Sequence, residues 1–250
     1  MTIERLQSVF LGIMGLTLLL LAWEVIGHYQ LVGITWPALS DVLSLLFDPA
    51  RRGLFERALT TTLAAASQGY LIGGVMGLGL AVIAHLSLAL RLGIERFSAF
   101  LNAIPPIALG PVFLVLLSRD ATPVGISAIN VFFIIFVSAS SGLRTVPESH
   151  RDLFSVFGAS SAQRLVRLEF PAALPVVVSG LKLAVPAALI GTIIGEWFGA
   201  TRGLGVLIVN AMQNFQISLL WSAVLLVTCM SLALYLMLTV LERSAYKRFR

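Results

Sequence analysis

The chain has 250 residues, of which 58% are hydrophobic and 12% are charged, and its formal net charge at pH 7 is +5. Soluble proteins contain roughly 45–50% apolar and 25% charged residues, so this composition indicates a membrane protein and excludes an ordinary soluble domain. A basic chain can bind nucleic acid, but in a membrane protein the positions of the charges matter more than their sum, and we expect no nucleic-acid partner.

Long uncharged stretches predict an all-α membrane protein with six transmembrane helices in a single domain, residues 1–250. Such a helix needs roughly 20 apolar residues to cross the hydrocarbon core, and the alternation expected of a transmembrane β-strand is absent. The predicted spans, in chain order, are Phe10–Gly27, Thr61–His85, Ser98–Leu117, Val124–Leu143, Val176–Gly195 and Leu219–Leu241.

The first span follows Arg5 and resembles the apolar part of a signal peptide. No small-residue cleavage pattern follows Trp23, so we interpret the stretch as a retained first transmembrane helix. After it, apolar and charged residues recur at helical spacing, which favours a helix lying on the outer membrane surface. That helix, on the outer face of the membrane that the spans cross, is expected to begin near Ser40 and to stop at Asp48-Pro49.

The second span carries glycines four residues apart, at Gly69, Gly73 and Gly77. Residues at this spacing share one helix face, so the strip lacks side chains and lets another helix approach closely. Such a strip is expected both of ordinary tight packing and of helices that move against each other.

The third span opens with Pro105 and Pro106 and contains Pro111. Proline donates no backbone hydrogen bond, so we expect this helix to bend or unwind where protein rather than lipid covers it. The segment could line a path, or the first two prolines could simply start a helix.

Catalytic and metal-binding patterns are missing from the sequence. The three histidines, His28, His85 and His150, have no second ligand at metal spacing, and Cys229, in an apolar run, is expected to be a small buried side chain. Neither a Gly-x-Ser-x-Gly motif nor a phosphate-binding loop occurs. We therefore expect no enzyme and no metal or cofactor in this chain, so that active transport would draw energy from a partner or an ion gradient.

Basic residues gather on one side of the predicted spans. Membrane proteins keep their basic residues preferentially in the cytoplasm, which predicts that both termini are cytoplasmic. With this orientation, the cytoplasmic segments hold twelve of the seventeen Lys and Arg residues. They are Arg5, Arg91, Arg96, Arg144, Arg151, Arg164, Arg167, Lys182, Arg243, Lys247, Arg248 and Arg250.

Between the fourth and fifth spans, the segment from Asp152 to Pro175 interrupts the apolar pattern. Its apolar residues fit two short amphipathic helices with Gly158 at the turn between them. Pro171 and Pro175 are expected to close the second helix and start the next span. The resulting cytoplasmic knob could dock on a partner, or it could lie on the membrane surface, held by its arginines.

The spacing in this segment resembles the EAA loop of bacterial ABC importer permeases, which reads Glu-Ala-Ala-x3-Gly-x9-Ile-x-Leu-Pro. Here the acid is Asp152, the glycine is Gly158 and the proline is Pro171. Leu153 and Phe154 replace the two alanines, so the spacing is kept although the identities are not.

Three further stretches are similar to the nitrate, sulfonate, taurine and thiamine-precursor branch of these permeases. They are AIPPIALGPVFLVLL, GASSAQRLVRLEFPAALPVVVSGLKLA and GEWFGATRGLGVLI. The resemblance implies an ABC importer transmembrane domain in the bacterial cytoplasmic (inner) membrane, paired with a second copy. It also implies a cytoplasmic ATPase dimer that binds ATP and Mg, and a periplasmic or lipid-anchored binding protein that delivers a small polar solute.

The resemblance implies that residues 150–171 form the loop that couples the permease to the ATPase. Phe154 and Phe157 would be apolar plugs, Gly158 the turn, and Arg164 and Arg167 charged contacts to the ATPase. The full coupling set is Asp152, Phe154, Phe157, Gly158, Arg164, Arg167 and Pro171.

Polar groups and prolines within the spans are candidates for the translocation path, although each polar group could instead bond helix to helix. The candidates are Gln68, Asn102, Pro105, Pro106, Asn130, Ser138, Ser140, Ser141 and Glu196. Glu196 is expected at the outer edge of the fifth span, and Lys182 is the basic residue inside a span.

The substrate class stays open between two kinds of small solute. Glu196-Trp197 is similar to the pair in carriers of pyrimidine-type thiamine precursors, whereas an anion such as nitrate, a sulfonate or taurine would need a buried basic group. An ion-coupled carrier, a channel without an ATPase, and a purely structural subunit remain alternatives.

Overall fold

A computed structural model describes residues 3–248, which form helices and contain no strand. The helices are α1 (Ile3–His28), α2 (Leu39–Leu46), α3 (Arg52–Leu86), α4 (Leu88–Ala103), α5 (Pro106–Leu116), α6 (Ala121–Leu143), α7 (Glu148–Val156), α8 (Ser161–Arg164), the π-helical turn η1 (Leu165–Glu169), α9 (Phe170–Gly199), α10 (Leu204–Gln213) and α11 (Ile217–Arg248). Five helices are long and apolar enough to cross a membrane, and a bent pair raises the total to six. The predicted all-α membrane fold is confirmed.

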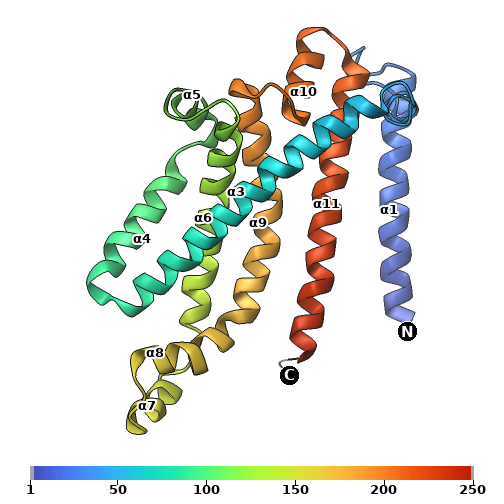
Figure 1. Cartoon of the computed structure of the whole chain (residues 1–250). Helices are drawn as coiled ribbons and strands as arrows, with labels where there is room; N and C mark the ends of the chain where they lie inside the picture. Colours follow the sequence, from blue (N-terminus) through green and yellow to red (C-terminus); the bar gives the residue numbers. More distant parts are fainter. Residues whose placement is uncertain (1–2, 249–250) are drawn as a thin grey trace.

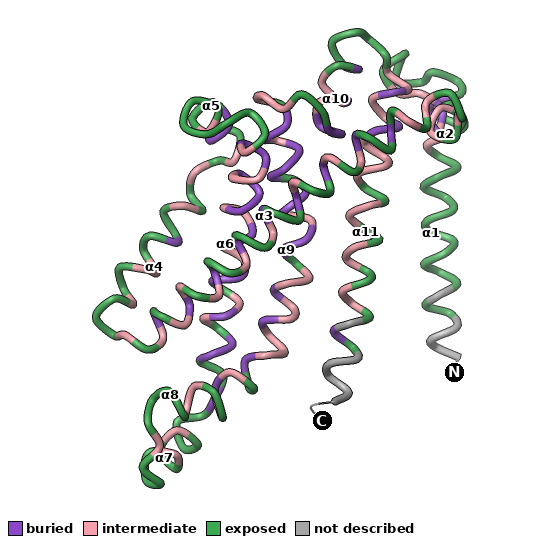
Figure 2. The backbone as a smooth tube through the Cα atoms, in the orientation of Figure 1, coloured by how far each residue is buried: buried purple, intermediate pink, exposed green. Residues whose placement is uncertain are grey.

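The centre of the bundle is α6, which packs along α3 on one side and along α9 on the other. Figure 1 shows α3 crossing the bundle obliquely, while α6 and α9 run side by side. Buried residues concentrate on α6 and on the facing sides of α3 and α9 (Figure 2). These three helices therefore hold the positions of the remaining elements.

The glycine strip of α3 lies directly on α6, as its spacing predicts. A side chain at Gly77 would meet the carbonyl oxygen of Phe132 at 2.6 Å, and one at Gly73 would collide with the carbonyl oxygen of Ala128. The two backbones are thus in contact without intervening side chains.

The third predicted span is broken rather than continuous. α4 ends at Ala103, α5 begins at Pro106, and the two helix axes are bent by 97°. The predicted bend is confirmed, because neither Pro105 nor Pro106 can donate the hydrogen bond that would carry the helix forward. The span predicted over Ser98–Leu117 is therefore corrected to two helices that begin earlier, at Leu88.

Pro171 lies in the first turn of α9, as predicted for the start of the fifth span, but neither proline ends a preceding helix, contrary to expectation. Pro171 and Pro175 both lie within α9, and α8, η1 and α9 run together from Ser161 to Gly199. A π turn bonds residues five apart, here Phe170 N to Leu165 O. This wider turn directly precedes Pro171, so the chain passes the proline without a break.

The first helix stands at the edge of the bundle (Figure 1). Within the apolar part of α1, only 6% of the residues are buried. It is attached near its end, where the Trp23 indole N–H donates to the Pro37 carbonyl and Glu24 accepts from Ser40. Trp23 also packs against Trp36 and Trp221. α2 ends before Asp48-Pro49, as predicted.

The bundle has two distinct ends (Figure 1). The pair α7 and α8 projects at the end where the N- and C-terminal helices also finish, while α2, α5 and α10 lie at the other end. Arg250 lies outside the described residues, as do the side chains of Arg5, Lys247 and Arg248. Cys229 is exposed on α11 rather than buried as expected.

Candidate functional site

The segment between α6 and α9 folds into the helical knob that its sequence predicts, residues 148–164. α7 ends at Val156 and is capped by Phe157, and Gly158 has a φ of +75°, which side-chain-bearing residues rarely adopt. The backbone N–H of Ala159 donates to the Phe154 carbonyl at 3.0 Å and closes the helix end. Ser160 then starts α8 through reciprocal bonds with Gln163.

The knob exposes an apolar tip. Phe157 is 80% exposed and Val156 is 82% exposed, and Leu153 stands beside them at 53%. Phe154 is half-buried. No residue of α7 or α8 is buried, so these apolar side chains are not used to hold the knob together. Large apolar side chains at the end of a projecting helix are typical of a contact surface.

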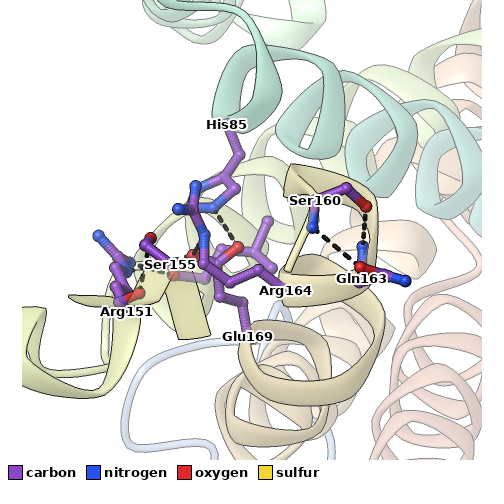
Figure 3. Close-up of polar contacts among 8 residues, drawn as sticks. His85, Arg151, Ser155, Ser160, Gln163, Arg164 and Glu169 are labelled. Atoms are coloured by element: carbon purple, nitrogen blue, oxygen red, sulfur yellow. Dashed lines mark hydrogen bonds and ion pairs between the residues drawn. The ribbon is translucent and has the colours of Figure 1, made fainter. Parts of the chain in front are cut away.

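The base of the knob is fixed by one buried carboxylate, Glu169, whose exposed fraction is 1%. Figure 3 shows it facing three basic side chains, His85, Arg151 and Arg164. The His85 Nε2 lies 2.8 Å from Oε2, and the two arginine Nε atoms each lie 3.2 Å from Oε1. Arg151 also donates to the carbonyl of Leu143 at 2.9 Å. We call these four side chains (Glu169, His85, Arg151 and Arg164) the ionic joint.

The ionic joint changes the expectation for Arg164. Its guanidinium, predicted to contact a partner, is turned inward toward Glu169, whereas Arg167 is exposed. Sequence reasoning missed Glu169 because residues five apart lie on different sides of an α-helix. The π turn brings Arg164 and Glu169 together. Asp152, within α7, and Pro171, in the first turn of α9, are both exposed.

A polar cleft lies at the opposite end of the bundle, between α3, the start of α6 and the link from α9 to α10. It has a volume of about 600 Å³ and brings together two of the predicted path residues, Gln68 and Glu196. Its remaining polar lining is Thr60, Thr61, Asp120, Thr201 and Arg202. The mixture of amide, hydroxyl and charged groups offers both donors and acceptors to a solute.

Glu196 lies near the end of α9, where it was expected, but it is buried, with an exposed fraction of only 2%. The Thr62 hydroxyl donates to one carboxyl oxygen at 2.7 Å, and the Gly205 N–H donates to the other at 2.6 Å. Thr62 in turn accepts from the Leu204 N–H at 2.8 Å. The carboxyl group therefore seats the first turn of α10 against α3, and only its edge reaches the cleft.

The other path candidates are scattered. Asn130 donates to the Ala187 carbonyl at 3.4 Å, and Ser138 packs against Gly180, so both serve the contact between α6 and α9. The remaining candidates fall into three groups: Asn102 and Ser141 are exposed, Pro105 and Pro106 form the break before α5, and the Ser140 hydroxyl is buried with no hydrogen-bond partner among the described residues.

Lys182 is paired with an acid. Its ammonium donates to Glu242 at 2.7 Å, and Ser179 donates to the other carboxyl oxygen at 2.7 Å. The hydrogen bond from Lys182 holds the pKa of the Glu242 carboxyl below its ordinary value. This basic group therefore links α9 to the end of α11.

Residues 69–250 match the family described as the inner membrane component of binding-protein-dependent transport systems. The chain belongs to this family. It is thus a permease subunit of an ABC importer for small solutes, which confirms the resemblance carried by the EAA-like loop. The permease is a non-catalytic membrane component, and its family excludes the ion-coupled carrier and the channel without an ATPase.

Individual relatives agree with this assignment. The permease is 30% identical to a probable ABC transporter permease protein of Haemophilus influenzae, over 87% of this chain and 89% of the relative. It is 29% identical to the formylaminopyrimidine transport permease protein ThiX of Halalkalibacterium halodurans, over 80% of both chains. It also shares its fold with a chain of the MetNI methionine ABC transporter in an inward-facing form, with a TM-score of 0.69 and 17% identity, over 79% of this permease and 99% of that chain.

Proposed function

We propose that two copies of this permease form the translocation path of an ATP-driven importer in the bacterial inner membrane. The observation that carries the proposal is the knob with its apolar tip, which fits a groove of a cytoplasmic ABC ATPase dimer. ATP and Mg belong to that ATPase, and a periplasmic or lipid-anchored binding protein delivers the solute. When ATP closes the ATPase pair, the two knobs approach and the permease opens outward, and after hydrolysis it returns to the inward-open state.

The orientation of the permease follows from two features in this proposal. The knob and both terminal helices lie at one end of the bundle, and most basic residues of the sequence belong to segments at that end. Both termini and residues 150–171 then face the cytoplasm, and the polar cleft opens on the outer side, where the binding protein releases its solute.

A pyrimidine-type thiamine precursor is the solute class that we favour over a nitrate-like, sulfonate-like or taurine-like anion. A relative at 29% identity is named for formylaminopyrimidine transport. The cleft offers amide and hydroxyl groups suited to a neutral heterocycle, whereas Lys182, which an anion path would require, is bound to Glu242. Arg202 at the cleft is the feature that suits an anion instead.

Docking of the ATPase is tested by placing a charge on the knob tip. Phe157→Asp is expected to weaken ATPase binding about 30-fold or more, because a buried phenylalanine contributes about 2 kcal/mol and every 1.4 kcal/mol is tenfold. Co-purification of the detergent-solubilised permease with its ATPase measures the effect. Phe47→Asp is the matched control, since Phe47 is 77% exposed on the other end of the bundle. A Phe157→Asp permease that binds the ATPase as well as the wild type does would overturn the docking proposal.

The cleft is tested by filling it. Gln68→Trp is expected to reduce solute uptake in proteoliposomes at least about tenfold, which corresponds to a rise of roughly 1.4 kcal/mol in the free-energy barrier to transport. Binding of the ATPase is expected to be unchanged. Ser67→Trp is the control, because Ser67 is the neighbouring exposed residue outside this cleft. Labelled formylaminopyrimidine, nitrate and taurine are supplied in parallel with the binding protein. Equal uptake by both variants contradicts the proposed path, and uptake of an anion alone contradicts the proposed solute class.

A further inference from the structure

The attachment of the knob to the bundle is ionic. Neither α7 nor α8 has a buried residue, and the apolar contact beside the knob is that of Leu165, directly after α8, with the core. The base of the knob is fixed by Arg151 of α7 and Arg164 of α8, which both face Oε1 of Glu169 at 3.2 Å. A buried carboxylate keeps its basic partners close, because separating them would leave an unpaired charge away from water.

The same carboxylate reaches beyond the knob to α3. Its second oxygen lies 2.8 Å from Nε2 of His85, which is in the last turn of α3. Arg151 adds a bond to the carbonyl of Leu143, the last residue of α6. The knob, α3 and the turn that precedes α9 therefore meet at Glu169 (Figure 3), and α6 is joined to them through Arg151.

α3 also carries the residues at the far end of the permease that line the cleft. Gln68 and Thr61 belong to the same uninterrupted helix as His85. A helix of this length moves as a stiff element, so a displacement of His85 at the joint displaces the cleft wall as well. The two arginines already offset the negative charge of buried Glu169. The contact with His85 is therefore not needed to stabilise the buried carboxylate, and it adds a link to α3.

We propose that Glu169 is a positioning residue that couples the knob to the cleft, transmitting movement of the docked ATPase through His85 into α3. This inference rests on the proposed function and adds to it the route by which one end of the permease drives the other. α9 receives the movement directly from η1, and α3 receives it through the imidazole. The carboxylate acts as a common pivot for both helices.

Two variants test the pivot at different points. Glu169→Gln keeps the size of the side chain and removes its charge, and His85→Leu leaves Glu169 with both arginines but disconnects α3. Both are expected to bind the ATPase like the wild type, since the tip at Phe157 is untouched. In proteoliposomes with the loaded binding protein, both are expected to transport at least about tenfold fewer solute molecules per ATP hydrolysed.

The matched control is Glu242→Gln, which removes a poorly exposed carboxylate that pairs with Lys182 and joins α9 to α11. For Glu242→Gln we expect a lower midpoint of thermal unfolding and an unchanged number of solute molecules transported per ATP. If Glu169 had a purely structural role, Glu169→Gln would give the same result. If Glu169→Gln fails to fold, His85→Leu alone decides, because its knob is intact. Glu169→Asp, which restores the charge, is expected to recover part of the coupling.

The outcomes separate this inference from the proposed function. A wild-type permease that does not bind the ATPase contradicts the proposed function itself. A wild type that binds and transports, together with a His85→Leu permease of unchanged transport per ATP, overturns the pivot alone. A His85→Leu permease that hydrolyses ATP when the binding protein is added but delivers little solute supports the pivot.

Discussion

Replacing Gly73 with leucine is expected to prevent the permease from reaching its folded state, at a cost of about 3 kcal/mol or more, the upper end of the range for overpacking. A Cβ atom at this position would collide with the Ala128 carbonyl oxygen and stand 2.9 Å from the Phe132 nitrogen. Both are backbone atoms of α6, which cannot rotate away as a side chain can. The two central helices would have to separate along their whole contact.

The neighbouring glycine provides the control for this prediction. A Cβ atom at Gly74 meets nothing within 4 Å, and leucine favours a helix over glycine by about 0.5–1 kcal/mol. Gly74→Leu is therefore expected to be neutral or slightly stabilising. The midpoint of thermal unfolding and the yield of monodisperse protein in detergent measure both variants. Equal midpoints for the two leucine variants would contradict the backbone contact between α3 and α6.

Removing the Glu196 carboxyl group is the second large effect that we expect. Glu196→Ala leaves the Gly205 N–H and the Thr62 hydroxyl buried without their acceptor. Each unpaired buried group costs about 1–3 kcal/mol, so the loss of stability from the two groups is expected to be about 2–6 kcal/mol. The first turn of α10 should detach from α3, and hydrogen exchange should accelerate over residues 204–213.

Variants of two adjacent threonines distinguish loss of this hydrogen-bond network from a general effect of substitution. Thr62→Val removes the hydroxyl that bridges Glu196 and the Leu204 N–H, so its loss should not add fully to that of Glu196→Ala in the double variant. Thr61→Val removes a hydroxyl whose hydrogen bond, among the described residues, goes to the Arg57 carbonyl of its own helix, and it should change stability by about 0.5 kcal/mol or less. Equal losses for the two valine variants would show that the network does not seat α10.

The parts of the fold that follow from local chemistry were predictable. Stretches of apolar residues located the spans, because any helix that crosses lipid needs them. Pro105 and Pro106 predicted the bend between α4 and α5, because proline restricts the backbone whatever its surroundings. Gly158 predicted the turn of the knob, because glycine adopts backbone angles that other residues avoid. The glycine strip predicted a close helix contact but not that its partner is α6.

The parts that depend on three-dimensional placement were missed or misjudged. Pro171 was expected to end a helix, but the preceding π turn carries the chain past it. That same turn hid the pairing of Arg164 with Glu169, which α-helical spacing does not indicate. Glu196 lies near the end of α9, where it was expected, but its burial and its acceptor role were missed because they depend on contacts with α3 and with α10, which folds back onto it.

The placement of α1 has a practical consequence. The matched family region starts only at residue 69, and α1 contacts the rest of the chain through the tryptophan cluster at one end, with almost no buried residue elsewhere. The apolar side chains of α1 pack against few residues of the same chain, so the amino-acid order of this helix is constrained by hydropathy and length rather than by packing. This helix is therefore the place to attach a fluorophore or spin label when the moving bundle must be observed without being altered.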